Sequence, residues 1–150
     1  MPQSYVASYF HLVFSTKSRE PLIHKTMQSR LYEYVGGILR SDESILLEAG
    51  GMADHVHLLV SLSKKVAVAD ALRTIKANSS KWIHEKFPKQ RGFAWQSGYG
   101  AFSVSYSNLG RVRRYIADQP EHHRVRSFQE EFLGFLRRHG VEYDPRYVWE

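Results

Sequence analysis

The stretch from Asp54 to Leu62 constrains the fold of this chain more than any other, because apolar residues alternate along it with two histidines. Side chains alternate between the two faces of a β-strand, so Val56 and its apolar neighbours are predicted on one face and His55 and His57 on the other. Two neutral imidazoles at this spacing can chelate a divalent cation, provided that a third ligand arrives from elsewhere in the fold. A strand histidine is also often a buried structural residue.

Length and composition indicate one globular domain with an anionic partner. The 150 residues, 43% of them hydrophobic, are enough for one hydrophobic core, so we expect a single domain over residues 1–150. The sequence has no cysteine, which excludes a disulfide framework and a thiolate nucleophile. Its formal net charge of +6 favours a nucleic-acid partner. No apolar stretch is long enough to span a membrane and no signal sequence is visible, so a cytoplasmic protein is expected.

The remaining periodicities predict the element order β-α-β-β-α-β. Strands are expected over residues 6–15, 44–49, 54–62 and 102–106, and helices over 25–40 and 66–87. Gly50-Gly51 is predicted to be the turn of a hairpin whose second strand carries the histidines. This order is the ferredoxin-like split βαβ arrangement, an α+β fold with an antiparallel sheet, helices on one face and an additional C-terminal helix and extension.

A third helix is expected over residues 108–119, capped by Ser107 and stopped by Pro120. Tyr115 and Gln119 lie one helical turn apart on a shared face, so Tyr115 is expected to face a cleft. A helix tyrosine taken alone is more often half-packed with its hydroxyl in water. Basic residues on and after this helix are candidates for holding a phosphodiester: Arg111, Arg114, His122, His123 and Arg124.

Several other side chains leave two interpretations open. Three basic residues of the long helix either contact a DNA backbone or form a solvated face: Arg73, Lys76 and Lys81. Asp54 either orients an imidazole from behind a metal site or simply begins the strand. His11 shares the histidine face, where packing is favoured over catalysis. The apolar helical pattern after Phe128 is expected to cover the domain or a partner subunit.

Two motifs carry a family resemblance. His55-Val56-His57 is a His-x-His signature, and Tyr115-Ile116-Ala117-Asp118-Gln119 is a Tyr-x-x-x-Gln pattern on a later helix. With these motifs in this order, and with the opening His11-Leu-Val-Phe-Ser-Thr-Lys17, nearly the whole chain resembles the single-tyrosine HUH transposases of the insertion sequence 200/605 group.

The resemblance implies an enzyme that cleaves and rejoins single-stranded DNA at the ends of a mobile element and recognises DNA hairpins. It implies that Tyr115 forms a 5′-phosphotyrosine intermediate, and that His55, His57 and Gln119 bind Mg²⁺ or Mn²⁺. It also implies a homodimer, in which the tyrosine helix meets the histidines either of its own subunit or of the partner subunit.

Three alternatives remain open at this point. A non-catalytic module could bind single-stranded RNA or DNA on a basic split βαβ sheet, although this leaves the histidine pair unexplained. A domesticated relative could use the same site on dispersed palindromic repeats. A mononuclear iron oxygenase would need a glutamate shortly after His57 and an all-β barrel, and the sequence offers neither.

Overall fold

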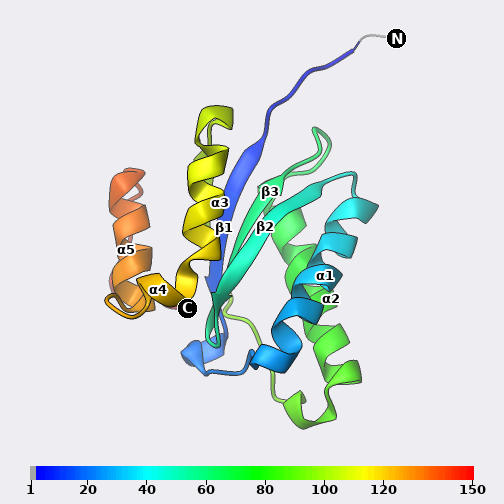
Figure 1. Ribbon diagram of the computed structural model, residues 1–150, viewed down its shortest axis with the longest axis vertical. Helices are drawn as coiled ribbons and strands as arrows, with labels where there is room; N and C mark the ends of the chain where they lie inside the picture. Colours follow the sequence, from blue (N-terminus) through cyan, green and yellow to red (C-terminus); the bar gives the residue numbers. More distant parts are fainter. Residues whose placement is uncertain (1–2) are drawn as a thin grey trace.

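The computed structural model describes residues 3–150 as a four-stranded antiparallel sheet with helices against both faces (Figure 1). The strands are β1 Tyr9–Ser15, β2 Ile45–Met52, β3 His55–Ser61 and β4 Gly100–Val104. The helices are α1 Lys25–Ser41, α2 Val68–Lys86, α3 Leu109–Ala117, α4 Gln119–His122 and α5 Phe128–Arg138, and short 3₁₀ turns span Lys17–Arg19, Pro88–Gln90 and Tyr106–Asn108. The strand order β2-β3-β1-β4 confirms the predicted ferredoxin-like split βαβ fold.

The register of the two central strands sorts their side chains as the alternation predicts. Leu12 of β1 lies opposite Leu58 of β3, and Val13 lies opposite His57. Leu12 and Leu58 belong to the larger core, which α1 and α2 complete with Met27, Leu31, Val35, Leu72, Ile75 and Ile83. The histidines therefore lie on the face that α1 and α2 leave free.

The opposite face is covered by the C-terminal part of the chain. Four apolar residues of α5 form a second core with Val13 of β1 and Phe102 of β4: Phe128, Phe132, Phe135 and Leu136. A capping box begins α5, in which Ser127 accepts a hydrogen bond from the backbone of Glu130 and the Glu130 side chain bonds back to Ser127. The apolar pattern after Phe128 thus covers the sheet of its own chain.

The predicted turn at Gly50-Gly51 is wrong. β2 runs through both glycines to Met52, and the hairpin turns at residues 53–54. A Cβ atom on Gly50 would overlap the backbone carbonyl oxygen of Ile116, and one on Gly51 would overlap the carbonyl of His55. The glycines are therefore explained by the close approach of α3 and of the neighbouring strand, rather than by a turn.

The ends of the strand and helix around Tyr115 also differ from expectation. β4 ends at Val104, and Ser107 lies in a 3₁₀ turn where its hydroxyl bonds Ser105 rather than capping α3. α3 ends at Ala117, and Gln119 begins a separate short helix that has Pro120 in its first turn. Pro120 has no N–H to bond the Ile116 carbonyl, so the helical hydrogen-bond pattern is interrupted there.

Among residues 3–150, no helix has the length and apolar character needed to cross a membrane.

Candidate active site

The two histidines of β3 lie together on the face of the sheet that α3 and α5 cover. Both are buried, and the Nδ1 atom of each ring has a polar neighbour at hydrogen-bond distance. His55 Nδ1 lies 2.7 Å from Asp54 Oδ1, and His57 Nδ1 lies 2.7 Å from Nε2 of His11 on β1. Partners of this kind fix the orientation of a metal-binding imidazole, and they leave both Nε2 atoms directed into the same space.

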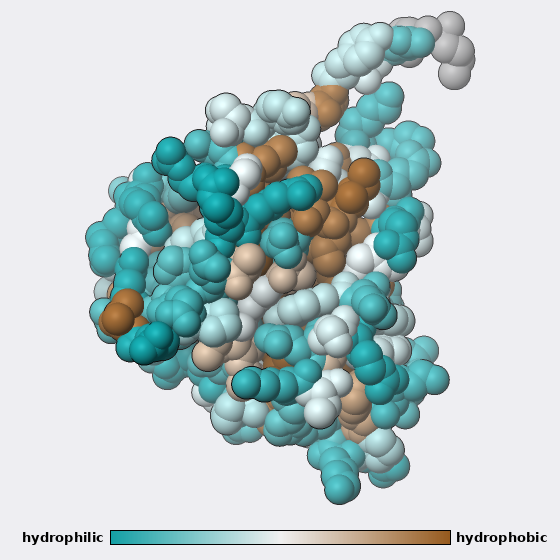
Figure 2. Space-filling model, viewed as in Figure 1, coloured by the Kyte–Doolittle hydropathy of each residue, from teal (hydrophilic) through white to brown (hydrophobic). Residues whose placement is uncertain are grey.

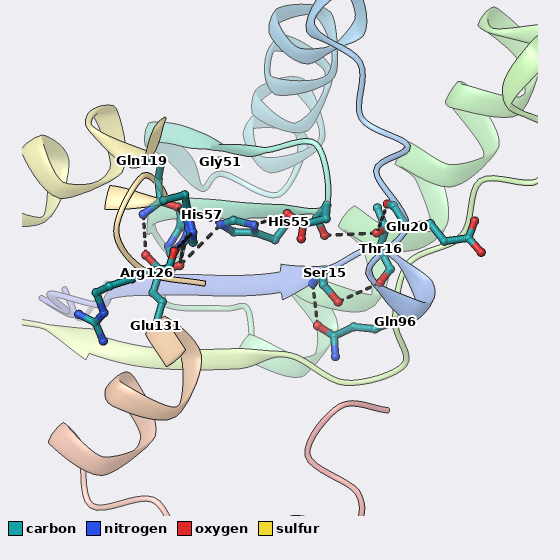
Figure 3. A network of polar contacts seen from close by, with 12 residues as sticks. Ser15, Thr16, Glu20, Gly51, His55, His57, Gln96, Gln119, Arg126 and Glu131 are labelled. Carbon is teal, nitrogen blue, oxygen red and sulfur yellow. Dashed lines mark hydrogen bonds and ion pairs between the residues drawn. The ribbon is translucent and has the colours of Figure 1, made fainter. Parts of the chain in front are cut away.

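Asp54 is held in place by the residue that follows β1. Thr16 donates a backbone hydrogen bond of 2.9 Å and a side-chain hydrogen bond of 3.2 Å to the Asp54 carbonyl, close to the contact between Ser15 and Gln96 (Figure 3). Burial raises the pKa of the Asp54 carboxyl, but its hydrogen bond and charge interaction with His55 lower it by more. An ionised Asp54 behind His55 has the placement expected of a residue that orients the imidazole.

α3 and α4 bring the other two motif residues to the histidines within one chain. Gln119 is fully buried, and its Oε1 atom lies 2.9 Å from His55 Nε2. The Tyr115 ring lies 5.9 Å from the His57 ring, centroid to centroid. The four residues predicted to form a site are therefore neighbours, although the break at Asp118 separates Tyr115 and Gln119 into two helices.

Glu131 of α5 is the functional candidate that the sequence analysis missed. Its carboxylate is buried and accepts hydrogen bonds from the Tyr115 hydroxyl and, at 2.8 Å, from Gln119 Nε2. The other carboxylate oxygen lies 2.9 Å from His57 Nε2. Figure 3 shows Glu131 rising from α5 toward Gln119 and His57. A usable signal was present, because position 131 falls between Phe128 and Phe135 in the apolar stripe of the helix, where a carboxylate is unexpected.

His123 also joins this cluster, instead of lying only on a DNA-facing surface as the sequence suggested. Its Nδ1 donates to the Arg126 carbonyl at 2.8 Å. Its Nε2 lies 3.0 Å from Gln119 Oε1 and 3.2 Å from Glu131 Oε1. The adjacent His122 ring stacks on Tyr115, with 4.3 Å between the centroids.

Burial and Glu131 together set the protonation states of the cluster. Burial lowers the pKa of His57 to about 4, although Glu131 acts in the opposite direction, so this ring is neutral near pH 7. Burial raises the pKa of Glu131, but the hydrogen bonds with His123 and His57 lower it well below its usual value. Burial and the hydrogen bond to Glu131 raise the pKa of Tyr115, so its hydroxyl keeps its proton.

The donor set of this cluster fits a metal ion. One ligand atom from each of His55, His57, His123 and Glu131 lies within 4.8 Å of all the others. His123 Nε2 faces two oxygens that only accept, while its Nδ1–H is already donated to a carbonyl. A neutral imidazole has one N–H, so either a proton or a metal cation must lie between Nε2 and these oxygens. The cluster could therefore hold a metal ion.

The predicted DNA-contacting residues fall into separate groups. Arg111 and Arg114 are exposed on α3, on the histidine side of the sheet, where hydrophilic side chains gather over the helix (Figure 2). Arg124 is exposed just after α4 and pairs with Glu121 at 3.0 Å. Arg73 and Lys81 are exposed on α2, which covers the opposite face of the sheet. A single surface does not contain all of them.

Lys76 corrects one of these predictions. Its ammonium donates to three backbone carbonyls, those of Gln96 at 3.0 Å, Ser97 at 3.3 Å and Gly98 at 2.6 Å. Burial lowers the pKa of Lys76 to about 8, which still leaves it charged at neutral pH. All three of its hydrogens are used within the protein, so Lys76 holds the loop before β4 instead of a phosphate.

The sequence matches the model of the family described as transposase IS200 like over residues 4–119. It is 30% identical over 122 residues to the transposase for insertion sequence element IS200 of Salmonella typhimurium, covering 75% of this chain and 76% of the relative. It is 24% identical over 115 residues to the ISDra2 transposase TnpA of Deinococcus radiodurans, covering 73% of this chain and 82% of the relative.

Two solved structures share the fold. A proposed transposase from Deinococcus radiodurans R1 has a TM-score of 0.64 and 23% identity, covering 79% of this chain and 96% of the other. A REP-associated tyrosine transposase bound to a REP hairpin has a TM-score of 0.61 and 14% identity, covering 82% and 73%. Because the family match includes both motifs and most of the sequence, the chain belongs to the IS200-like transposase family.

Proposed function

We propose that this transposase cleaves and rejoins single-stranded DNA through a covalent bond between Tyr115 and a 5′-phosphate. One observation carries the proposal: the Tyr115 hydroxyl bonds the carboxylate of Glu131, which also contacts Gln119 and His57. A tyrosine nucleophile and a metal-binding cluster therefore meet within a single chain. Covalent catalysis suits a transposase, because the phosphotyrosine ester preserves the phosphodiester until a second DNA end attacks it.

The tyrosine oxygen attacks the scissile phosphorus, and the bond from phosphorus to the 3′-oxygen breaks. The Tyr115 hydroxyl already points at Glu131 Oε2, so this carboxylate oxygen is placed to receive its proton. The departing 3′-oxygen takes a proton from solvent water and becomes a free 3′-OH, and the proton received by Glu131 returns to solvent. Rejoining is the reverse, in which a 3′-OH attacks the phosphotyrosine and Tyr115 regains its proton.

His55, His57 and Gln119 would hold Mg²⁺ or Mn²⁺ beside this reaction. The ion would make the phosphorus more electrophilic and stabilise the charge that develops on its oxygens. The protein residues orient this set: Asp54 holds His55, and His11 holds His57. Near pH 7 the neutral His57 ring has the protonation state that metal binding requires.

We propose single-stranded DNA with hairpin structure as the substrate and the cytoplasm as the place of action. The fold neighbour bound to a REP hairpin supports a hairpin substrate, and the exposed arginines of α3 supply positive charge beside the site. We also propose that the protein acts as a homodimer with one complete site in each subunit, because Tyr115 reaches its own chain's cluster. Size-exclusion chromatography with light scattering tests the dimer.

The REP-associated neighbour also favours a second candidate, an enzyme that uses the same chemistry on dispersed palindromic repeats. The two candidates differ only in substrate. Labelled single strands from the flanks of the gene and from genomic palindromic repeats would show which of them forms the adduct.

The first test is a denaturing-gel assay for a covalent protein–DNA adduct with Mn²⁺ or Mg²⁺ present. We expect an adduct with the natural chain, and its loss in Tyr115→Phe and in His57→Ala. Tyr106→Phe is the matched control, because Tyr106 is exposed just before α3 and should leave the adduct unchanged. If the chain bound DNA tightly and in a salt-sensitive way but formed no adduct, it would be a non-catalytic DNA-binding module and the proposal would be wrong.

A further inference from the structure

We propose that Glu131 and His123 are metal ligands, in addition to His55, His57 and Gln119. Such a site has five protein donors, three of them imidazoles, and selects Mn²⁺ over Mg²⁺. The inference rests on the proposed function, since it concerns the same centre. Both added residues follow the family match, which ends at residue 119, so the C-terminal segment of this chain completes the site.

Glu131 Oε1 lies at the distances expected between two ligands of one ion. It is 2.9 Å from His57 Nε2, 3.2 Å from His123 Nε2 and 3.6 Å from His55 Nε2. Two donors that each lie about 2.1 Å from an ion can be at most about 4.2 Å apart. The carboxylate also has room for two roles, because Oε1 faces the histidines while Oε2 faces Tyr115 and Gln119.

His123 has the orientation of a metal ligand, because a hydrogen bond at one ring nitrogen fixes the direction of the other. Its Nδ1–H is fixed by the Arg126 carbonyl, which leaves Nε2 directed at Gln119 and Glu131. Its ring packs against His55, with 4.6 Å between the centroids. His55 is oriented in the same way by Asp54. Ligating histidines typically give their second ring nitrogen to such a partner.

The donor set decides which ion the site prefers. Imidazole nitrogen suits first-row transition ions, whereas Mg²⁺ prefers oxygen ligands and usually keeps several of its waters. Five protein donors with three nitrogens leave few positions for those waters. Mn²⁺ accepts both nitrogen and carboxylate oxygen, and the five-donor centre therefore favours it.

The test measures binding of the metal alone, without DNA. Isothermal titration calorimetry measures the affinity for Mn²⁺ and for Mg²⁺ in Glu131→Gln and in its control, Glu130→Gln. The control removes the same charge from the neighbouring exposed position, and its glutamine can still serve in the capping box. The same titrations compare His123→Ala with His24→Ala, an exposed histidine before α1. Electron spin echo spectroscopy of bound Mn²⁺ reports the ¹⁴N couplings of coordinated imidazoles.

We expect the natural chain to bind Mn²⁺ more tightly than Mg²⁺. Glu131→Gln and His123→Ala should each weaken Mn²⁺ binding on the order of tenfold or more, and His123→Ala should remove one ¹⁴N coupling, while both controls bind as the natural chain does. Circular dichroism of the metal-free variants checks folding, and each variant decides the role of the residue that it replaces.

Two other outcomes overturn the inference and are distinguishable. In the first outcome, both variants bind Mn²⁺ as tightly as the natural chain or more tightly, the ¹⁴N couplings are unchanged, and His57→Ala loses binding. This result would limit the site to His55, His57 and Gln119 and leave the proposed function intact. Failure of the natural chain to bind either ion would overturn the metal-dependent part of the proposed function as well.

Discussion

His57 couples the stability of the fold to pH. Its pKa is about 4 in the folded chain and 6.5 in an ordinary histidine, so the unfolded chain binds more protons between these two values. Stability therefore rises with pH across this window and is lost as pH falls from 6.5 toward 4. His11, whose pKa burial lowers, adds to the effect. His123 opposes it, because its raised pKa contributes stability that is lost as pH rises above 6.5.

We expect the free energy of unfolding to fall by about 1–3 kcal/mol between pH 7 and pH 5. Urea denaturation at several pH values, with a chelator present, measures this dependence. His57→Gln cannot take up the proton, so its dependence should be shallower. An equal slope in the natural chain and the variant would show that His57 is not the titrating group.

Lys76 is expected to stabilise the loop before β4. Lys76→Met leaves the carbonyls of residues 96–98 without their donor and should lower the free energy of unfolding by about 1–3 kcal/mol. Lys81→Met, on an exposed position of the same helix, should change it by no more than about 0.5 kcal/mol. Urea denaturation of both variants measures these changes. If Lys76→Met reduced DNA affinity without loss of stability, Lys76 would be a DNA contact instead.

Sequence patterns located part of the candidate site. The strand alternation placed His55 and His57 on one face, and helical spacing brought Tyr115 near Gln119. Glu131 and His123 were not recognised as neighbours of the site, because their contacts depend on how α5 folds back over the sheet. The apolar stripe of α5 marks Glu131 as an unusual carboxylate, but it does not show that this residue lies beside the histidines.

The contact between β2 and α3 controls the position of the helix that carries Tyr115. Gly50→Ala would place a methyl group against the backbone of Ile116, which cannot rotate away as a side chain can. We expect a loss of about 1–3 kcal/mol in the free energy of unfolding and a reduced yield of the covalent adduct.

Gly92→Ala is the matched control for this contact. Nothing lies within 4 Å of a Cβ atom at Gly92, so this substitution should leave stability within about 0.5 kcal/mol and the adduct unchanged. Thermal denaturation and the adduct assay check both variants. Equal behaviour of the two would mean that α3 can shift without consequence.

The elements themselves were predictable where one face is apolar. α1 and α2 lie close to the expected residues because their stripes repeat every three or four positions. The Gly50-Gly51 turn was predicted wrongly because the need for glycine comes from neighbouring elements: at Gly50 from α3, which lies more than fifty residues later in the chain, and at Gly51 from the His55 carbonyl of β3. Local turn statistics do not register such a tertiary contact.

The exposed positive charge is divided between the two faces of the sheet. If DNA lies over the candidate site, the arginines of α3 contact phosphates and the exposed basic residues of α2 do not. Replacing Arg111 and Arg114 together by glutamine should reduce the slope of log affinity against log salt by about 1–2, because each phosphate contact with a single strand contributes about 0.7.

The matched control replaces Arg73 and Lys81, which removes the same charge from α2. Fluorescence anisotropy with a labelled single strand at several salt concentrations measures both slopes. A reduced slope only in the α2 variant would place the DNA on the opposite face of the sheet and away from Tyr115.

Tyr115 is adjacent in sequence to Ile116, the buried residue of α3. Ile116 is fully buried, and its carbonyl packs directly against Gly50 of β2. α3 cannot lift from the sheet without opening this contact, so the proposed mechanism would need a rotation of the Tyr115 side chain to carry its oxygen from Glu131 to a phosphodiester. Such rotations are far faster than the microsecond-to-millisecond displacement of a helix. Under the proposed mechanism, positioning the nucleophile would therefore require no slow movement of α3.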